Sequence, residues 1–179
     1  MPIYCDESGG VGRGVMTLAA LSISVEAADN VVARFRQITG LKGELKGSRI
    51  DLTERALLFE LLGPGEWHAT VGIAISALKP EPGDDRGDHD IAIYSALLDD
   101  VIGSMVEARP DCSEVIIDDG RYGIETLKLV RNAVGRLVGP LGTASLTVSH
   151  VLAGLQLADV ISNSFFNRAM VSERQGRMA

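Results

Sequence analysis

Length, composition and charge narrow the class of protein before any motif is considered. The chain has 179 residues, of which 46% are hydrophobic and only 4% aromatic, and its formal net charge is −7. The length predicts a single domain, residues 1–179, with an aliphatic core, and the acidic balance argues against a protein that coats nucleic acid through bulk charge.

The cysteines and the N-terminal residues bear on compartment. Cys5 and Cys112 are the two cysteines of the chain, too few for a disulfide framework or a zinc site, and we expect reduced thiols. Met1-Pro2 does not begin a signal peptide, and no window approaches the roughly 18 apolar residues of a spanning helix. We therefore expect a cytoplasmic protein without membrane contact, and a homo-oligomer is compatible with this composition.

The first half of the chain predicts a hairpin, two helices and a third strand. Strands are expected at residues 3–6, 15–25 and 67–75, and helices at 27–39 and 51–63. The glycine-rich stretch from Gly9 to Gly12 predicts the turn of the hairpin, and Gly40 predicts the end of the first helix. Asp51 and Glu54 fit the capping box of the second helix.

The second half alternates helices with short strands. Residues 79–87 predict a loop, helices are expected at 90–108, 124–138 and 155–170, and strands at 114–119 and 146–148. A hairpin followed by alternating elements predicts an α/β fold with a mixed sheet of about five strands and helices on both faces.

Acidic residues end two of these strands. Asp6 and Glu7 close the first, and Asp118 and Asp119 close a later one. Binding sites of α/β sheets gather at strand ends, so the two pairs would lie side by side if the strands are parallel neighbours. Carboxylates placed there cost desolvation unless a cation meets them, and a divalent metal is the cation we expect.

Two further segments contribute polar residues to the same hypothesis. Gln156, Asp159 and Asn163 form a polar strip at i, i+3 and i+7 on an otherwise apolar helix. Glu44 stands among cations, with Lys46 two residues away. Taken singly, Asp118 and Asp119 could open a turn, while Asp159 and Glu44 could face solvent. Ser8 fits a turn better than a nucleophile, because no G-x-S-x-G surrounds it.

These elements occur together in one known family. The chain resembles the uncharacterised family called domain of unknown function 3800 in Tyr4-x-Asp6-Glu7-Ser8-Gly9, Glu44-Leu45-Lys46-Gly47-Ser48, Ile117-Asp118 and Leu155-Gln156-Leu157-Ala158-Asp159. The resemblance covers nearly the whole chain, and the first and last of these motifs are its most specific parts. It implies a ribonuclease-H-like fold, binding of Mg²⁺ or Mn²⁺, and phosphodiester hydrolysis.

The resemblance also implies roles for individual residues. The implied metal ligands are Asp6, Glu44, Asp118 and Asp159. Asp6 would bridge two ions, and Lys46 would offset charge on the phosphate. From the residues themselves, we expect Glu7 and Asp119 either to support the ligands without binding the ion or to be solvated. Ser8 and Gln156 are also expected to support the ligands, Gln156 by orienting Asp159. In the wider ribonuclease-H pattern the glutamate follows three strands and lies on a helix, whereas Glu44 precedes the third predicted strand.

Three functions follow from these residues. The leading hypothesis is a metal-dependent phosphodiesterase that acts on nucleic acid. A hydrolase of nucleotides or other small phosphoesters would use the same acids and fits the acidic charge better. The third is a non-catalytic interaction module on the same fold.

Overall fold

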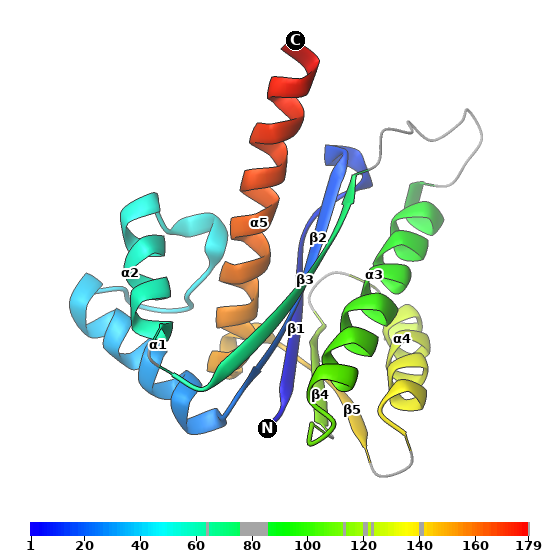
Figure 1. Ribbon diagram of the computed structural model, residues 1–179, viewed down its shortest axis with the longest axis horizontal. Coiled ribbons are helices and arrows are strands. Elements are labelled where there is room, and N and C mark those ends of the chain that lie inside the picture. Colours follow the sequence, from blue (N-terminus) through cyan, green and yellow to red (C-terminus); the bar gives the residue numbers. More distant parts are fainter. Residues whose placement is uncertain are drawn as a thin grey trace.

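A five-stranded mixed sheet forms the centre of the fold in the computed structural model (Figure 1). The structure describes residues 1–63, 65–75, 86–112, 114–119, 122, 124–139 and 142–178. The strands are β1 (Ile3–Gly10), β2 (Val15–Ile23), β3 (Trp67–Ile75), β4 (Glu114–Asp118) and β5 (Thr143–Thr147). Their order across the sheet is β3-β2-β1-β4-β5, which places β1 in the middle.

The sheet combines an antiparallel half with a parallel half. β2 pairs antiparallel with both β1 and β3, whereas β4 pairs parallel with β1 and with β5. All nine residues of β2 are buried, and all but Thr17 and Ser22 are apolar, because an interior strand covered on both faces is almost continuously apolar rather than alternating. The predicted hairpin and mixed sheet are both confirmed.

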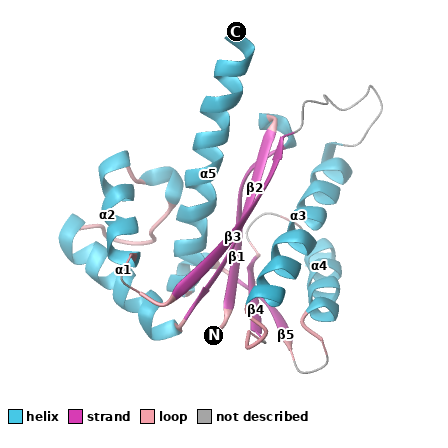
Figure 2. Ribbon diagram, in the orientation of Figure 1, coloured by secondary structure: helices cyan, strands magenta, loops and turns pink. Residues whose placement is uncertain are grey.

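Helices cover both faces of the sheet, as predicted (Figure 2). One face carries α1 (Val25–Thr39), α2 (Leu52–Leu62) and α5 (Ala153–Met178), and the other carries α3 (Arg86–Ala108) and α4 (Ile124–Leu137). Strand alternation divides the core between the two faces. Tyr4 packs with α1, α2 and α5, while Ile3 and Cys5 pack with α3 and α4.

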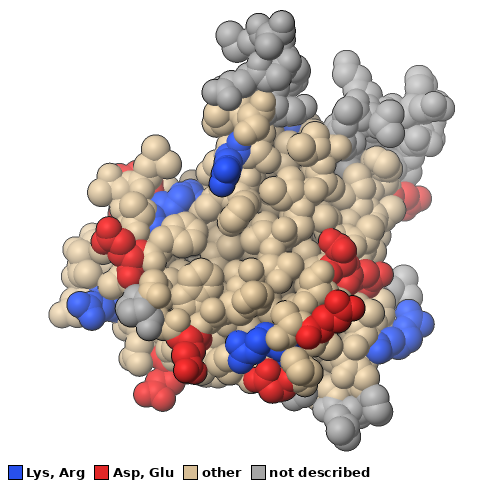
Figure 3. All heavy atoms as spheres, in the orientation of Figure 1, with Lys and Arg blue, Asp and Glu red and all other residues tan. Residues whose placement is uncertain are grey.

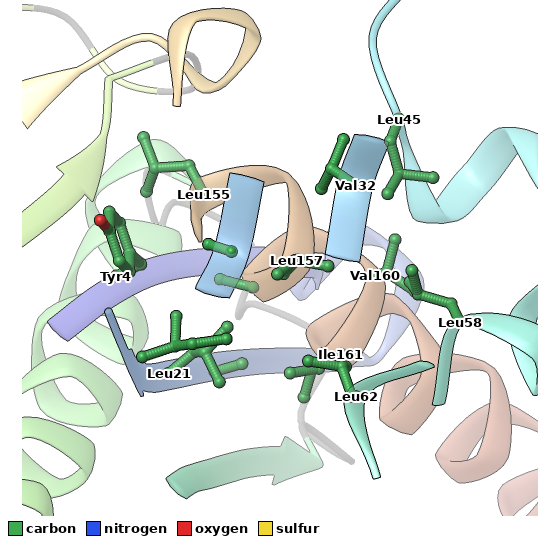
Figure 4. Packing of buried hydrophobic residues seen from close by; sticks show 14 of the residues in the cluster. Tyr4, Leu21, Val32, Leu45, Leu58, Leu62, Leu155, Leu157, Val160 and Ile161 are labelled. Carbon is green, nitrogen blue, oxygen red and sulfur yellow. The ribbon is translucent and has the colours of Figure 1, made fainter. Parts of the chain in front are cut away.

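The core under α5 includes a residue that belongs to no helix or strand. Leu45 is fully buried and points into the same cluster as Val32 of α1 and Val160 of α5 (Figure 4). The segment between α1 and α2 is therefore anchored in this core by its own apolar side chain. This anchor fixes the position of Glu44, which precedes it.

Several predicted bounds are confirmed and others are wrong. β3 spans the predicted residues, and the capping box is present, with Glu54 N–H donating to Asp51 Oδ1 at 2.8 Å. β1 does not end at Asp6; it continues to Gly10 because each residue pairs with β2 up to Val15. Ser8 therefore lies in a strand, and the prediction of a turn there was wrong. Of the predicted 79–87 loop, residues 79–85 lie outside the described residues, and Arg86 and Gly87 begin α3.

The second half of the chain differs from prediction mainly at two elements. β5 begins at Thr143 rather than at residue 146, and α5 starts at Ala153 and reaches Met178. The start of β5 was not predicted, because its first residues are small or polar and the strand is only partly buried, so the sequence shows no clear apolar pattern there. Both cysteines are free, as expected, and both are buried. None of the helices formed by the described residues is long and apolar enough to cross a membrane.

Candidate active site

The register of the parallel strands sets Asp6 beside Asp118. β1 and β4 pair Tyr4 with Ile116 and Cys5 with Ile117, so one further step brings Asp6 level with Asp118. Tyr4 and Ile116 belong to the core under α5, and alternation turns both aspartates toward that same face. Asp6 lies within its own strand, but at the level where the neighbouring strand ends.

Asp159 comes to this face because α5 packs closely on β1. A Cβ atom added to Gly154, in the first turn of α5, would lie 2.4 Å from the ring of Tyr4, so the helix contacts the strand at a distance that only glycine permits. Five residues on, Asp159 Oδ2 accepts a hydrogen bond from the Gly47 N–H at 2.8 Å. That Asp159 faces a site rather than solvent stays a prediction, with which this hydrogen bond is compatible.

Glu44 is carried by residues 43–47, which we call the glutamate segment. Two arginines hold its ends: Arg36 Nη2 donates to the Gly43 carbonyl at 2.8 Å, and Arg55 Nη2 donates to the Gly47 carbonyl at 2.7 Å. Arg55 also donates to Ser164 Oγ at 2.6 Å, which ties the segment to α5. Burial lowers the pKa of Arg55, and the charge of Asp159 acts in the opposite direction.

Gly47 lies directly against α5. A Cβ atom there would be 2.6 Å from Cβ of Asn163 and 3.1 Å from the Asp159 carbonyl oxygen. This close approach is what allows the Gly47 N–H to reach the Asp159 carboxylate. Asn163, the last residue of the predicted polar strip, accepts a hydrogen bond from Arg55 Nη2 at 3.1 Å.

Gln156 has a different role from the one predicted. Its Oε1 accepts from Leu45 N–H and from Arg36 Nη2, both at 3.1 Å, and its Nε2 donates to the carbonyls of Ser149 and His150. It is almost fully buried. Gln156 therefore connects the glutamate segment to the residues after β5, rather than orienting Asp159.

Ser149 joins two of the predicted ligands and was missed by the sequence reasoning. Its N–H donates to Asp118 Oδ1 at 2.8 Å, and its Oγ donates to Glu44 Oε1 at 2.6 Å. The one signal for it in the sequence is that Ser149 directly follows a predicted strand. The structure shows that this strand, β5, is parallel to β4, so the chain leaves the sheet at the edge where Asp118 lies. His150, the neighbour of Ser149, is exposed.

Burial and like charge dominate the electrostatics of Asp6. Its side chain is 7% exposed. Burial raises the pKa of the Asp6 carboxyl well above the ordinary range, and the charges of Glu7, Asp159 and Asp118 raise it further, against a lowering by a backbone hydrogen bond from Glu7. Asp6 thus lies in the combined field of carboxylates from its own strand, β4 and α5.

The pKa of the Asp159 carboxyl is also raised. Burial raises its pKa, and Asp118 and Glu44 add to this, whereas the Gly47 N–H and Lys46 lower it. Lys46 Nζ lies 3.4 Å from Glu44 Oε1, and its side chain is 37% exposed. The charges of Asp118 and Asp159 therefore act on Asp6, and those of Asp118, Glu44 and Lys46 act on Asp159.

Three residues that were expected to support the ligands lie elsewhere or contact other groups. Glu7 faces α3 by strand alternation, and after burial its charge is the largest cause of the raised pKa of Tyr94. The Ser8 carbonyl accepts a 3.4 Å hydrogen bond from Thr17 Oγ1, and the Asp119 N–H donates to the Thr147 carbonyl at 3.3 Å. Glu7 lies on the face opposite Asp6, yet its charge raises the pKa of Asp6, so its supporting role stays a prediction.

The chemistry of this donor set fits a divalent cation. Neighbouring carboxylates make the ionised form of a buried carboxyl unfavourable, and a bound cation offsets this repulsion. Mg²⁺ binds oxygen ligands such as carboxylates. Across the part of the chain that the structure describes, no three histidine, cysteine, aspartate or glutamate side chains are arranged to hold one ion. Mg²⁺ needs only one or two carboxylates beside water and substrate oxygens, so a magnesium site does not require such a group of three, and the set of four ligands stays a prediction.

Comparison with solved structures places the fold. A chain in the structure of the PCNA:RNase HII complex from Archaeoglobus fulgidus aligns with 99% of this chain and 78% of its own length, at a TM-score of 0.56 and 11% identity. Ribonuclease H2 from Pyrococcus horikoshii aligns at a TM-score of 0.59 and 13% identity over 97% of this chain and 75% of that one. The fold is ribonuclease-H-like.

A third solved structure matches the same fold, whereas comparisons of sequence find no match. RNase H3 from Aquifex aeolicus aligns at a TM-score of 0.52 and 17% identity over 97% of this chain, which spans 60% of that protein. No family model matches the chain, and no curated protein matches it in sequence. At such identities the likeness establishes the fold, and function must be argued from the site.

The raised pKa of Asp6 predicts how the stability of the metal-free protein changes with pH. In the folded state Asp6 keeps its proton to a higher pH than in the unfolded chain. The contribution of Asp6 to the free energy of unfolding is therefore fully present below the ordinary aspartate pKa, and it is lost as the pH rises through the raised pKa of the folded state. Urea unfolding with a chelator, from about pH 4 to about pH 8, should show Asp6→Asn increasingly more stable than wild type. A constant difference across this range would contradict the prediction.

Proposed function

We propose that this chain is a divalent-metal-dependent phosphodiester hydrolase that acts on nucleic acid. The observation that carries the proposal is the buried Asp6 carboxyl, which lies in the field of Asp118 and Asp159 from separate elements. Structural likeness to proteins named RNase HII, ribonuclease H2 and RNase H3 supports it. Such a concentration of carboxylates is unfavourable by itself, which points to a cation as part of the working site.

Each residue of the site has a task in this proposal. Asp6 would lie between Asp118 and Glu44 on one side and Asp159 on the other, and these four would hold the ion or ions. A bound divalent cation supplies an activated water and stabilises charge on the phosphate. Lys46, half-exposed beside Glu44, would contact a phosphate oxygen and orient the substrate. The Gly47 N–H fixes the Asp159 carboxylate.

A second candidate is a hydrolase of nucleotides or other small phosphoesters at the same site. The net charge of −7 favours it, because long polyanions are repelled by an acidic protein at low salt. Figure 3 shows acidic and basic side chains interspersed over the visible face, and the described residues there form no broad basic area. The chemistry would be unchanged, and only the length of the substrate would differ.

Hydrolysis of a substrate panel tests these proposals. The panel holds single-stranded and duplex DNA and RNA, an RNA–DNA hybrid and free nucleotides, each with Mg²⁺, with Mn²⁺ or with a chelator. We expect cleavage of a polymer that the chelator abolishes and that Asp100→Asn, an exposed position on α3, leaves unchanged. Cleavage of nucleotides alone would select the second candidate. An absence of both hydrolysis and calorimetric metal binding would leave a non-catalytic interaction module.

A further inference from the structure

One serine is hydrogen-bonded to two acids of the site that come from different parts of the chain. Ser149 lies in the 3-10 turn Ser149–Val151, directly after β5, and is 8% exposed. Its N–H reaches Asp118 Oδ1 at 2.8 Å and its Oγ reaches Glu44 Oε1 at 2.6 Å. Hydrogen bonds to ionised acceptors are shorter and about twice as strong as neutral ones, so this residue links β4 to the glutamate segment.

The position of Ser149 is fixed by two independent features. Asp118 pairs with Thr147 at the end of β5, so the chain that leaves β5 passes the carboxyl end of β4. Gln156 Nε2 then donates to the Ser149 carbonyl at 3.3 Å, while its Oε1 accepts from Leu45 N–H at 3.1 Å. The same buried amide thus holds Ser149 and the residue next to Glu44.

The donors that meet Glu44 determine which of its oxygens remains for a ligand. Ser149 Oγ and Lys46 Nζ, at 2.6 and 3.4 Å, both reach Oε1. Among the described residues, these contacts leave Oε2 as the oxygen without a donor. A carboxylate held through one oxygen loses rotational freedom before a ligand arrives, which lowers the cost of ordering it on binding.

We propose that Ser149 is a positioning residue of the metal site, whose hydroxyl holds Glu44 by Oε1 so that Oε2 is presented to the cation while its N–H holds Asp118. The inference rests on the proposed function, because it assigns Ser149 a task toward the same cation. Without the hydroxyl, Glu44 must be ordered when the cation binds. Loss of such an outer contact lowers metal affinity by about 10- to 100-fold in metalloproteins.

Calorimetric titration of Mn²⁺ into the metal-free full chain tests this assignment. Ser149→Ala removes the hydroxyl and keeps the backbone N–H, and we expect it to weaken binding by about 10- to 100-fold. Ser149→Thr keeps a hydroxyl and should bind much as wild type does. Ser22→Ala is the matched control, because it removes a buried hydroxyl that contacts Cys112 at 3.3 Å on the opposite face of the sheet; it should leave Mn²⁺ affinity unchanged.

A double-mutant cycle separates positioning from general loosening of the fold. In a Glu44→Ala background the Ser149 hydroxyl has no carboxylate to hold, so Ser149→Ala should cause no further loss of Mn²⁺ affinity. An equal loss in both backgrounds would overturn the inference. If Ser149→Ala does not fold, Ser149→Cys, whose thiol is a weaker donor, takes its place in both titrations.

The possible results distinguish the two levels of the proposal. Mn²⁺ binding by wild type with equal or tighter binding by Ser149→Ala overturns the role of Ser149 alone, because the hydroxyl would then be neutral or compete with the cation. No Mn²⁺ binding by wild type overturns the proposed function, and the role of Ser149 with it.

Discussion

Replacing Asp6 with asparagine is expected to lower metal-dependent hydrolysis by at least about a hundredfold. The substitution keeps the size of the side chain and removes one negative charge from the centre of the carboxylate group. Metal-ion catalysis supplies several kcal/mol of transition-state stabilisation, and each 1.4 kcal/mol lost is about a tenfold loss of rate. Initial rates on the best substrate of the panel, at saturating Mg²⁺ or Mn²⁺, give the comparison.

The same substitution is expected to raise the thermal unfolding midpoint of the metal-free protein. Burial and neighbouring carboxylates make ionised Asp6 unfavourable in the folded state, and asparagine removes that charge without leaving a cavity. A divalent cation should narrow this difference in midpoint, because the cation stabilises wild type more than the variant. Loss of function with gain of stability is typical of a residue retained for chemistry rather than for folding.

Exposed Asp100 on α3 provides the matched control for both measurements. Asp100→Asn makes the same chemical change outside the site. It should leave the rate and the unfolding midpoint nearly unchanged, because exposed substitutions usually change the free energy of unfolding by no more than about 0.5 kcal/mol. Full activity in Asp6→Asn would mean that a contaminant or another site performs the hydrolysis. A lower midpoint in the metal-free variant would contradict the electrostatic account of Asp6.

Local patterns were enough to predict most of the secondary structure. The alternation of residues 67–75 and the capping box at Asp51 are contained in a few neighbouring residues, and both appear in the structure as predicted. The end of β1 was wrong because the glycines after Ser8 were taken to end the strand, whereas pairing with β2 extends it to Gly10. Asp6 lies at a functional edge for a different reason, namely that the neighbouring β4 ends at Asp118.

Some residues of the candidate site could be predicted from local sequence, whereas others could not because their contacts join distant parts of the chain. Asp6, Asp118 and Asp159 were visible in the sequence because each is out of place in an apolar strand or helix, and Glu44 was visible because it stands among cations. Their partners, Ser149, Arg55 and Gly47, join segments far apart in the chain, and no local pattern of residues reports such contacts. The face of Glu7 could have been predicted, since neighbouring residues of a strand point to opposite sides and Asp6 already occupies the side under α5.

Truncation of Leu45 is expected to damage both the fold and the site. Leu45 is fully buried in the core under α5 (Figure 4), and leucine-to-alanine changes in such positions cost about 2–5 kcal/mol in the free energy of unfolding. The side chain is also the apolar anchor of the glutamate segment, between Glu44 and Lys46. Leu45→Ala should therefore lower urea stability and also weaken Mn²⁺ binding and hydrolysis.

Two other leucines separate these effects. Leu58 on α2 is 1% exposed in the same core but lies outside the glutamate segment, whereas Leu52 is 82% exposed. We expect Leu58→Ala to lose about as much stability as Leu45→Ala, within the same 2–5 kcal/mol, yet to keep wild-type Mn²⁺ affinity at temperatures where it remains folded. Leu52→Ala should change neither. If Leu45→Ala and Leu58→Ala lose Mn²⁺ affinity equally, the position of Glu44 depends on the core as a whole. If only Leu45→Ala loses it, the anchor acts locally, because one buried side chain holds the carboxylate beside it.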